Sequence, residues 1–134
     1  MALPPFRFFG GKGGVGKTTC AAAAALAAAE SGTRTLVVST DPAHSLGDAL
    51  AHRLSAEPTP VVTRKGLLLA AELDAGRALS RWLGERRETF RQIAERGTYL
   101  DEQDVDRLLG LSLPGADELV ALLELPRLAH RSEA

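Results

Sequence analysis

Three short runs centred on apolar residues stand out in the first half of the chain. They cover Phe6–Phe9, Arg34–Ser39 and Leu67–Leu73. Short apolar runs between turn-forming residues favour buried strands, although the third run has the apolar pattern of a buried helix as well. We predict that all three runs are strands.

An alanine-rich segment lies between the first two runs. Residues 17–30 include eight alanines between Ala21 and Ala29, which gives high helix propensity and little bulk to hold the helix off a sheet. Ser31 and Gly32 then form a helix stop. This order of strand, helix and strand predicts a βαβ unit, whose right-handed crossover makes its two strands parallel.

The second half of the chain has a helical period. Apolar residues recur at helical spacing from Asp74 to Arg96, and again over residues 119–123, where Pro126 is expected to kink or end the helix. Another helix is expected to open at Asp101 and Asp104. We expect the leucines of these helices to form a core, and a groove for an apolar partner helix is the alternative.

These patterns predict an α/β fold with two parts. The loop at residues 56–60 holds two prolines, which cannot continue a helix. We assign residues 1–73 to a βαβ core and residues 74–134 to a mainly helical subdomain.

A glycine-rich loop joins the first apolar run to the alanine-rich segment, and it fits the phosphate-binding pattern G-x-x-x-x-G-K-[ST]. Glycines let the backbone N–H groups face an anion, and a helix start adds about half a unit of positive charge. Lys17 is expected to bind the β- and γ-phosphates, and the Thr18 hydroxyl to bind Mg²⁺. The predicted nucleotide-binding residues are Gly11, Lys12, Gly13, Gly14, Val15, Gly16, Lys17, Thr18 and Thr19.

A polar stretch follows the second predicted strand, at the carboxyl edge where open α/β sheets bind ligands. Its Asp41 is expected to orient an attacking water or to bind magnesium through water. Ser45 and Asp48 have the spacing of a capping box, which predicts that Ser45 caps a short helix.

Composition excludes several classes of function. The chain has 17 acidic and 16 basic residues and no basic stripe, so we do not expect nucleic acid as a partner. No apolar run approaches the roughly 20 residues of a membrane span, and we expect a cytoplasmic protein. The single cysteine, Cys20, excludes a site built from several thiols of this chain, and we expect it to be buried.

The loop from Lys12 to Thr19 resembles the deviant Walker A motif K-G-G-x-G-K-[ST]-[ST]. Residues 39–45 resemble the switch I motif [ST]-x-D-P-A-H-[SN] of the branch that contains the arsenite-pump ATPase ArsA and the ATPase that delivers tail-anchored proteins. Residues 98–118 are also similar to bacterial ArsA-like proteins. The resemblance therefore covers most of the chain.

This resemblance implies a P-loop NTPase fold with a parallel sheet and flanking helices, ATP and Mg²⁺ as cofactors, and a homodimer formed through the nucleotide face. It implies that Asp41 is the catalytic, water-orienting carboxylate and that His44 supports its loop. It also implies that Lys12 reaches the nucleotide of the other subunit, as arginine fingers do. Such fingers raise the rate of hydrolysis by about 10³–10⁵-fold. A protein client or a membrane partner is implied, whereas arsenite efflux is disfavoured by the single cysteine.

The family's next motif, switch II (D-T-A-P-T-G-H), does not occur in the sequence. We expect an incomplete domain, the N-terminal part of a longer ATPase; a protein split over two chains and a short relative are the alternatives. The expected function is Mg²⁺-dependent ATP hydrolysis that drives opening and closing of a dimer. A nucleotide-binding interaction module without hydrolysis is the rival hypothesis.

Overall fold

The computed structural model of the chain describes residues 6–41, 43, 45–97, 103–104, 107 and 116–133. These residues separate into two compact units, and each has its own architecture. The first unit contains the residues up to Leu73 and those from Leu128 onward, and the second contains Asp74–Arg127.

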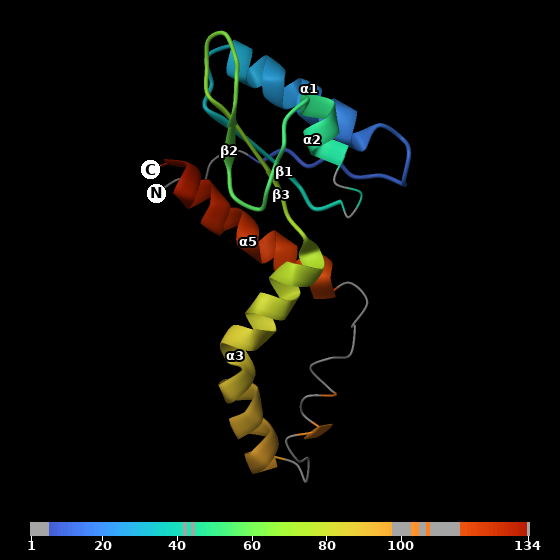
Figure 1. Cartoon of the computed structure of the whole chain (residues 1–134), viewed down its shortest axis with the longest axis vertical. Helices are drawn as coiled ribbons and strands as arrows, with labels where there is room; N and C mark the ends of the chain where they lie inside the picture. The colour runs from blue at the N-terminus through green and yellow to red at the C-terminus, as the bar shows by residue number, and fades with distance from the viewer. Residues whose placement is uncertain are drawn as a thin grey trace. The chain divides into compact units, whose positions relative to one another are not determined.

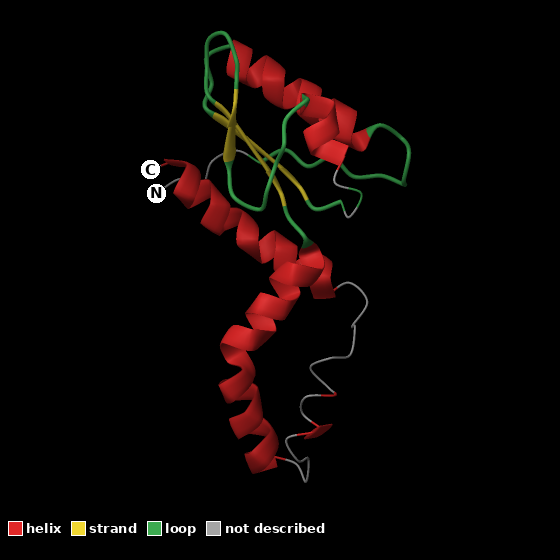
Figure 2. Cartoon of the chain, in the orientation of Figure 1, coloured by secondary structure: helices red, strands yellow, loops and turns green. Residues whose placement is uncertain are grey.

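The first unit is built on a three-stranded mixed sheet (Figures 1 and 2). Its strands are β1 (Thr35–Ser39), β2 (Thr59–Val61) and β3 (Leu68–Glu72), in the order β1-β3-β2. The predicted strands over 34–39 and 67–73 are thus confirmed. Because β1 and β3 are parallel, with Ser39 opposite Glu72, their carboxyl ends lie at the same edge of the sheet.

Helix α1 (Lys17–Glu30) has the bounds that the sequence predicts. It ends at Ser31, and Gly32 follows with a φ of 95°, as expected for a helix stop. The helix contacts β1 and β3, and its buried residues Ala22, Ala25 and Ala29 recur on one face. Since alanine has almost no side chain, the helix packs close to the sheet.

The core of this unit is small and aliphatic. Helix α2 (Ser45–Leu50) lies beside α1 and contributes Leu46, which is only 1% exposed (Figure 1). Other buried residues come from all three strands and from α1, so the sheet and both helices share one core. Its members are Ala22, Ala25, Ala29, Val37, Leu46, Leu50, Val61, Leu68 and Ala70.

The first predicted strand is absent, and the predicted βαβ unit is therefore wrong. Residues 6–9 are irregular, and Phe6, Phe8 and Phe9 are 47%, 72% and 39% exposed. A strand needs a neighbour to take its backbone hydrogen bonds, and no described strand pairs with this segment. The sheet is also mixed rather than parallel throughout, because β2 runs antiparallel to β3.

Strand β2 overturns part of the predicted loop at residues 56–60, because it includes Thr59 and Pro60. Proline has no N–H to donate to a ladder and is confined to sheet edges. Among the described strands β2 pairs with β3 alone, so it forms such an edge. Edge position explains how a proline-containing segment joins the sheet.

The second unit is helical. Helix α3 (Ala75–Gly97) confirms the helix predicted from Asp74 to Arg96. Helix α5 (Ala116–Glu133) begins in this unit, and its residues from Leu128 onward belong to the first unit. The helix runs on through Pro126, so this proline does not end it, and the alternative of a kink stays a prediction. The helix predicted to open at Asp101 lies largely outside the described residues. The described residues of this stretch, 103, 104 and 107, are helical. Within the described part of the chain, no helix has the length and apolar character to cross a membrane.

Candidate functional site

The glycine-rich loop leads directly into helix α1. Gly14 and Gly16 have φ values of 75° and 85°, a region that L side chains rarely adopt, so glycine is required there. Gly16 is the N-cap of α1 and no side chain caps it, and the first turn of the helix contains no acidic residue. The first N–H groups of α1 therefore lack a side-chain acceptor, which suits an anion.

Lys17 folds back over this loop. Its Nζ donates a hydrogen bond to the backbone carbonyl of Lys12, at 3.1 Å. The structure thus brings together the two lysines of the predicted site, through the side chain of one and the backbone of the other. The side chain of Lys12 is exposed.

Thr18 contacts helix α2 across 27 positions of sequence. Its Oγ1 lies 2.9 Å from Oγ of Ser45, and this hydroxyl pair is partly buried. Ser45 is the first residue of α2 and its hydroxyl bonds to Thr18, so the predicted capping box is wrong. The hydroxyl predicted to bind Mg²⁺ therefore contacts a residue of the stretch that resembles switch I.

Asp41 lies in a tight turn after β1. Its backbone N–H donates to Oγ of Ser39 at 3.2 Å, and its Oδ1 accepts from the N–H of Ala43 at 3.0 Å. These bonds fix the turn at the carboxyl edge of the sheet. No hydrogen bond joins Asp41 to the glycine-rich loop within the described residues, and His44 lies outside them.

Glu72 contacts helix α2 in a way that the sequence patterns do not predict. It ends β3, and its Oε1 accepts hydrogen bonds from the backbone N–H groups of Leu46 at 2.8 Å and Gly47 at 2.9 Å. Those are the second and third residues of α2, whose N–H groups have no partner within a helix. One signal was present in the sequence, because Glu72 is the only charged residue in the apolar run 67–73.

Comparison with known proteins identifies the family. A family model described as anion-transporting ATPase matches residues 5–133. The chain belongs to the anion-transporting ATPase family. It is 41% identical over 123 residues to a protein of Chlorobaculum tepidum that carries the provisional name arsenical pump-driving ATPase, and 38% identical over 136 residues to ATPase GET3B of Arabidopsis thaliana.

The match to these ATPases covers most of this chain but a minor part of theirs. The two alignments include 89% and 87% of the chain, and they include 28% and 31% of the respective relatives. The chain therefore spans less than a third of the length of these relatives. The resemblance to the ArsA and tail-anchored-protein branch is confirmed at the level of family.

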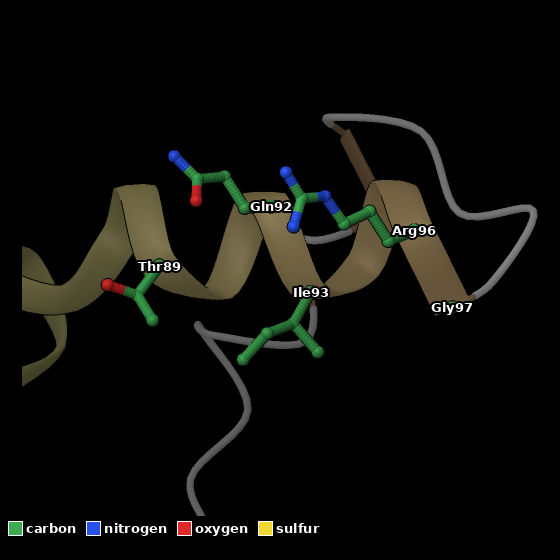
Figure 3. A pocket seen from close by; sticks show the side chains of 5 residues that line it. All are labelled: Thr89, Gln92, Ile93, Arg96 and Gly97. Carbon is green, nitrogen blue, oxygen red and sulfur yellow. The ribbon is translucent and has the colours of Figure 1, made fainter.

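Three further features of the described residues bear on possible sites. Cys20 is exposed, which corrects the prediction that it is buried. The described residues contain no group of three or more His, Cys, Asp or Glu that could hold a metal ion. A shallow pocket on α3 is drawn in Figure 3, with lining residues Thr89, Gln92, Ile93, Arg96 and Gly97.

Proposed function

We propose that this chain binds ATP at the glycine-rich loop and the start of α1, as part of a P-loop NTPase domain. One observation carries the proposal. The N-cap of α1 is Gly16, which has a left-handed conformation and no side chain, so the first N–H groups of α1 have no capping side chain. Such a helix start takes a phosphate group readily. The side chain of Lys17, which lies over the loop, supplies a mobile positive charge for the β- and γ-phosphates.

The hydroxyl of Thr18 fits a role as a Mg²⁺ ligand. Mg²⁺ prefers hard oxygen ligands and keeps several waters, so one hydroxyl together with phosphate oxygens and water forms a sufficient site. When bound, the ion would neutralise charge that develops on the phosphates. The carboxylate of Asp41 would hold such an ion through water, and its Oδ1 accepts a hydrogen bond from the N–H of Ala43.

We propose that hydrolysis then depends on three side chains. Asp41 orients the attacking water, and Lys17 stabilises charge on the transferred phosphoryl group. The exposed side chain of Lys12 acts on the nucleotide of a second subunit, in a homodimer formed through the nucleotide face. ATP turnover would open and close this dimer and change its affinity for a protein client or a membrane partner.

The test is equilibrium binding of ATP with Mg²⁺ and steady-state turnover, measured on the same samples of the 134-residue chain. Lys17→Ala should weaken ATP binding by about 10- to 100-fold, because a charged hydrogen bond contributes about 1.5–3 kcal/mol. Asp41→Asn should keep binding and lower turnover by about 10²–10⁴, the usual contribution of a positioned acid or base.

Matched controls use exposed residues of the same types. Lys65→Ala and Asp48→Asn should leave both binding and turnover within about twofold of the unmodified chain, because both residues are exposed. Binding that needs Lys17 with no turnover in any sample would favour the non-hydrolysing interaction module. A chain that fails to bind ATP would refute the proposed site.

A further inference from the structure

Three contacts form a continuous connection from the first turn of α1 to the end of β3. Thr18 Oγ1 contacts Ser45 Oγ, and Ser45 opens helix α2. The backbone N–H groups of the next two residues, Leu46 and Gly47, donate to one oxygen of Glu72. The ends of this connection lie more than 50 positions apart in sequence, so local chain geometry does not produce it.

Glu72 performs the capping role that would otherwise belong to Ser45. A capping side chain accepts from the second or third N–H group of a helix, and Glu72 accepts from both in α2. The carboxylate also complements the positive end of the helix dipole. The Ser45 hydroxyl is therefore left to bond with Thr18.

The backbone of Glu72 is fixed as well. Its N–H donates to the carbonyl of Ser55 at 2.8 Å, and the N–H of Leu73 donates to the carbonyl of Ser39 at 2.8 Å. Glu72 also pairs with Ser39 in the parallel ladder. The carboxylate thus projects from the carboxyl end of the central strand, which is hydrogen-bonded to Ser39 and Ser55, and the start of α2 is held against that end.

We infer that Glu72 is a positioning residue for metal-nucleotide binding. By holding the start of α2, Glu72 keeps the Ser45 hydroxyl in contact with the Thr18 hydroxyl, and this contact orients the Thr18 hydroxyl. This inference rests on the proposed function, in which Thr18 binds Mg²⁺. A hydroxyl that gives a lone pair to a metal must point its proton elsewhere, and Ser45 Oγ, at 2.9 Å, is an acceptor in reach. Groups that orient metal ligands in this way commonly change metal affinity by about 10- to 100-fold.

A double-mutant cycle on ADP affinity tests the inference. Binding is measured with Mg²⁺ and with EDTA for the unmodified chain, Ser45→Ala, Glu72→Ala and the double variant. Each single variant should weaken binding about 10-fold with Mg²⁺ and leave binding in EDTA within about twofold. The double variant should be no weaker than the single variants, because both changes remove the same connection.

A second readout needs no nucleotide. Hydrogen exchange at the amides of Leu46 and Gly47 should be slow in the unmodified chain, and Glu72→Ala should accelerate it at least about 10-fold. Glu72→Gln retains a carbonyl oxygen and should restore most of the protection. Ser45→Ala should leave these amides protected, because it removes the other end of the connection.

Matched controls separate positioning from general stability. Glu30→Ala removes a carboxylate that accepts from the N–H of Arg64 at 2.9 Å, and Ser31→Ala removes a hydroxyl bonded to the carbonyl of Ala28 at 2.7 Å. Both lie at the far end of α1 and should not change Mg²⁺-dependent affinity. If Glu72→Ala does not fold, Ser45→Ala decides alone by its effect with Mg²⁺ against EDTA.

The outcomes distinguish this inference from the function on which it rests. Three results would each overturn the inference: additive losses in the cycle, equal losses in EDTA, or Mg²⁺-dependent affinity that Ser45→Ala leaves unchanged. In each case, ADP binding by the unmodified chain would still support the proposed site. Absence of ADP binding by the unmodified chain would overturn both. Non-additive losses confined to Mg²⁺, together with deprotected amides in Glu72→Ala, would support both.

Discussion

Replacement of Gly66 by alanine should destabilise the first unit, because this glycine lies against the end of α1. A Cβ at Gly66 would collide with the backbone carbonyl oxygen of Ala29, and the carbonyl oxygen of Thr33 would lie only 3.1 Å away. Both obstacles are backbone atoms, so no side chain can rotate to make room. The neighbouring N–H of Arg64 donates to Glu30 at 2.9 Å, which further ties this turn to the helix.

The expected loss follows from two opposing terms. Overpacking of this kind costs about 1–3 kcal/mol, and occasionally more. A change from glycine to alanine restricts the unfolded chain and returns about 0.4–1 kcal/mol. Because the clash involves backbone on both sides, we expect the upper part of the first range and a net loss of at least about 1 kcal/mol.

Urea unfolding followed by circular dichroism measures this loss. With a slope of about 2 kcal/mol per molar urea, the midpoint should fall by roughly 0.5 M or more. The amide of Thr35, which donates to the carbonyl of Leu67 at 2.8 Å, should also exchange faster, since it adjoins the displaced turn.

Gly10→Ala is the matched control, because no atom lies within 4 Å of a Cβ at that position and it belongs to the same unit. Its stability should stay within about 0.5 kcal/mol of the unmodified chain. Equal midpoints for Gly66→Ala and the unmodified chain would refute the close packing of this turn against α1.

Three further predictions follow from the helices. Ala25→Leu should cost about 1–3 kcal/mol by overpacking against the sheet, whereas Ala27→Leu on the exposed face should stay within about 0.5 kcal/mol; equal urea midpoints would contradict this. Hydrogen bonds from Arg91 and then Gln92 lower the pKa of Glu88 to about 2, so its stabilising effect on α3 is present above the unfolded value of 4.5 and disappears as the pH falls through about 2. An NMR titration of the Glu88 carboxyl carbon checks this, and a midpoint near 4.5 would contradict it. Pro126→Ala should raise helicity by circular dichroism and stabilise α5 by up to about 3 kcal/mol, since it restores an N–H in the helix interior; lower helicity would show that the proline is needed there.

Helix α1 shows which features of the fold the sequence specifies. Its start follows from the glycine loop and its end from Ser31 and Gly32, and both bounds agree with the structure. Strand β3 is predicted less uniquely, because its apolar run also fits a buried helix, and its short length favours the strand that the structure has. Signals of this kind are local, so the sequence alone suffices to read them.

Phe6–Phe9 shows where local signals are insufficient. The run has strand composition, yet none of the described strands pairs with it, and its three aromatic residues are at least 39% exposed. Pro60 shows the opposite error, because edge position in the sheet overrides the usual role of proline. Strand identity in both cases depends on which neighbour is present, and a single segment does not contain that information.

The candidate site also has one part that local sequence patterns predict and another part that they do not. The phosphate-binding pattern specifies backbone geometry directly, and the structure has glycines at positive φ in the glycine-rich loop; that this loop binds phosphate stays a prediction. The capping role of Ser45 was predicted from spacing and was wrong, because a carboxylate 27 positions away, on Glu72, takes those N–H groups. Local rules predict that the N–H groups at a helix start need hydrogen-bond acceptors, but the tertiary fold decides which residue supplies the acceptor. Because Glu72 accepts from these N–H groups, the Ser45 hydroxyl is left to contact Thr18. The connection between the hydroxyl that we propose as a Mg²⁺ ligand and the sheet is therefore a property of the tertiary fold.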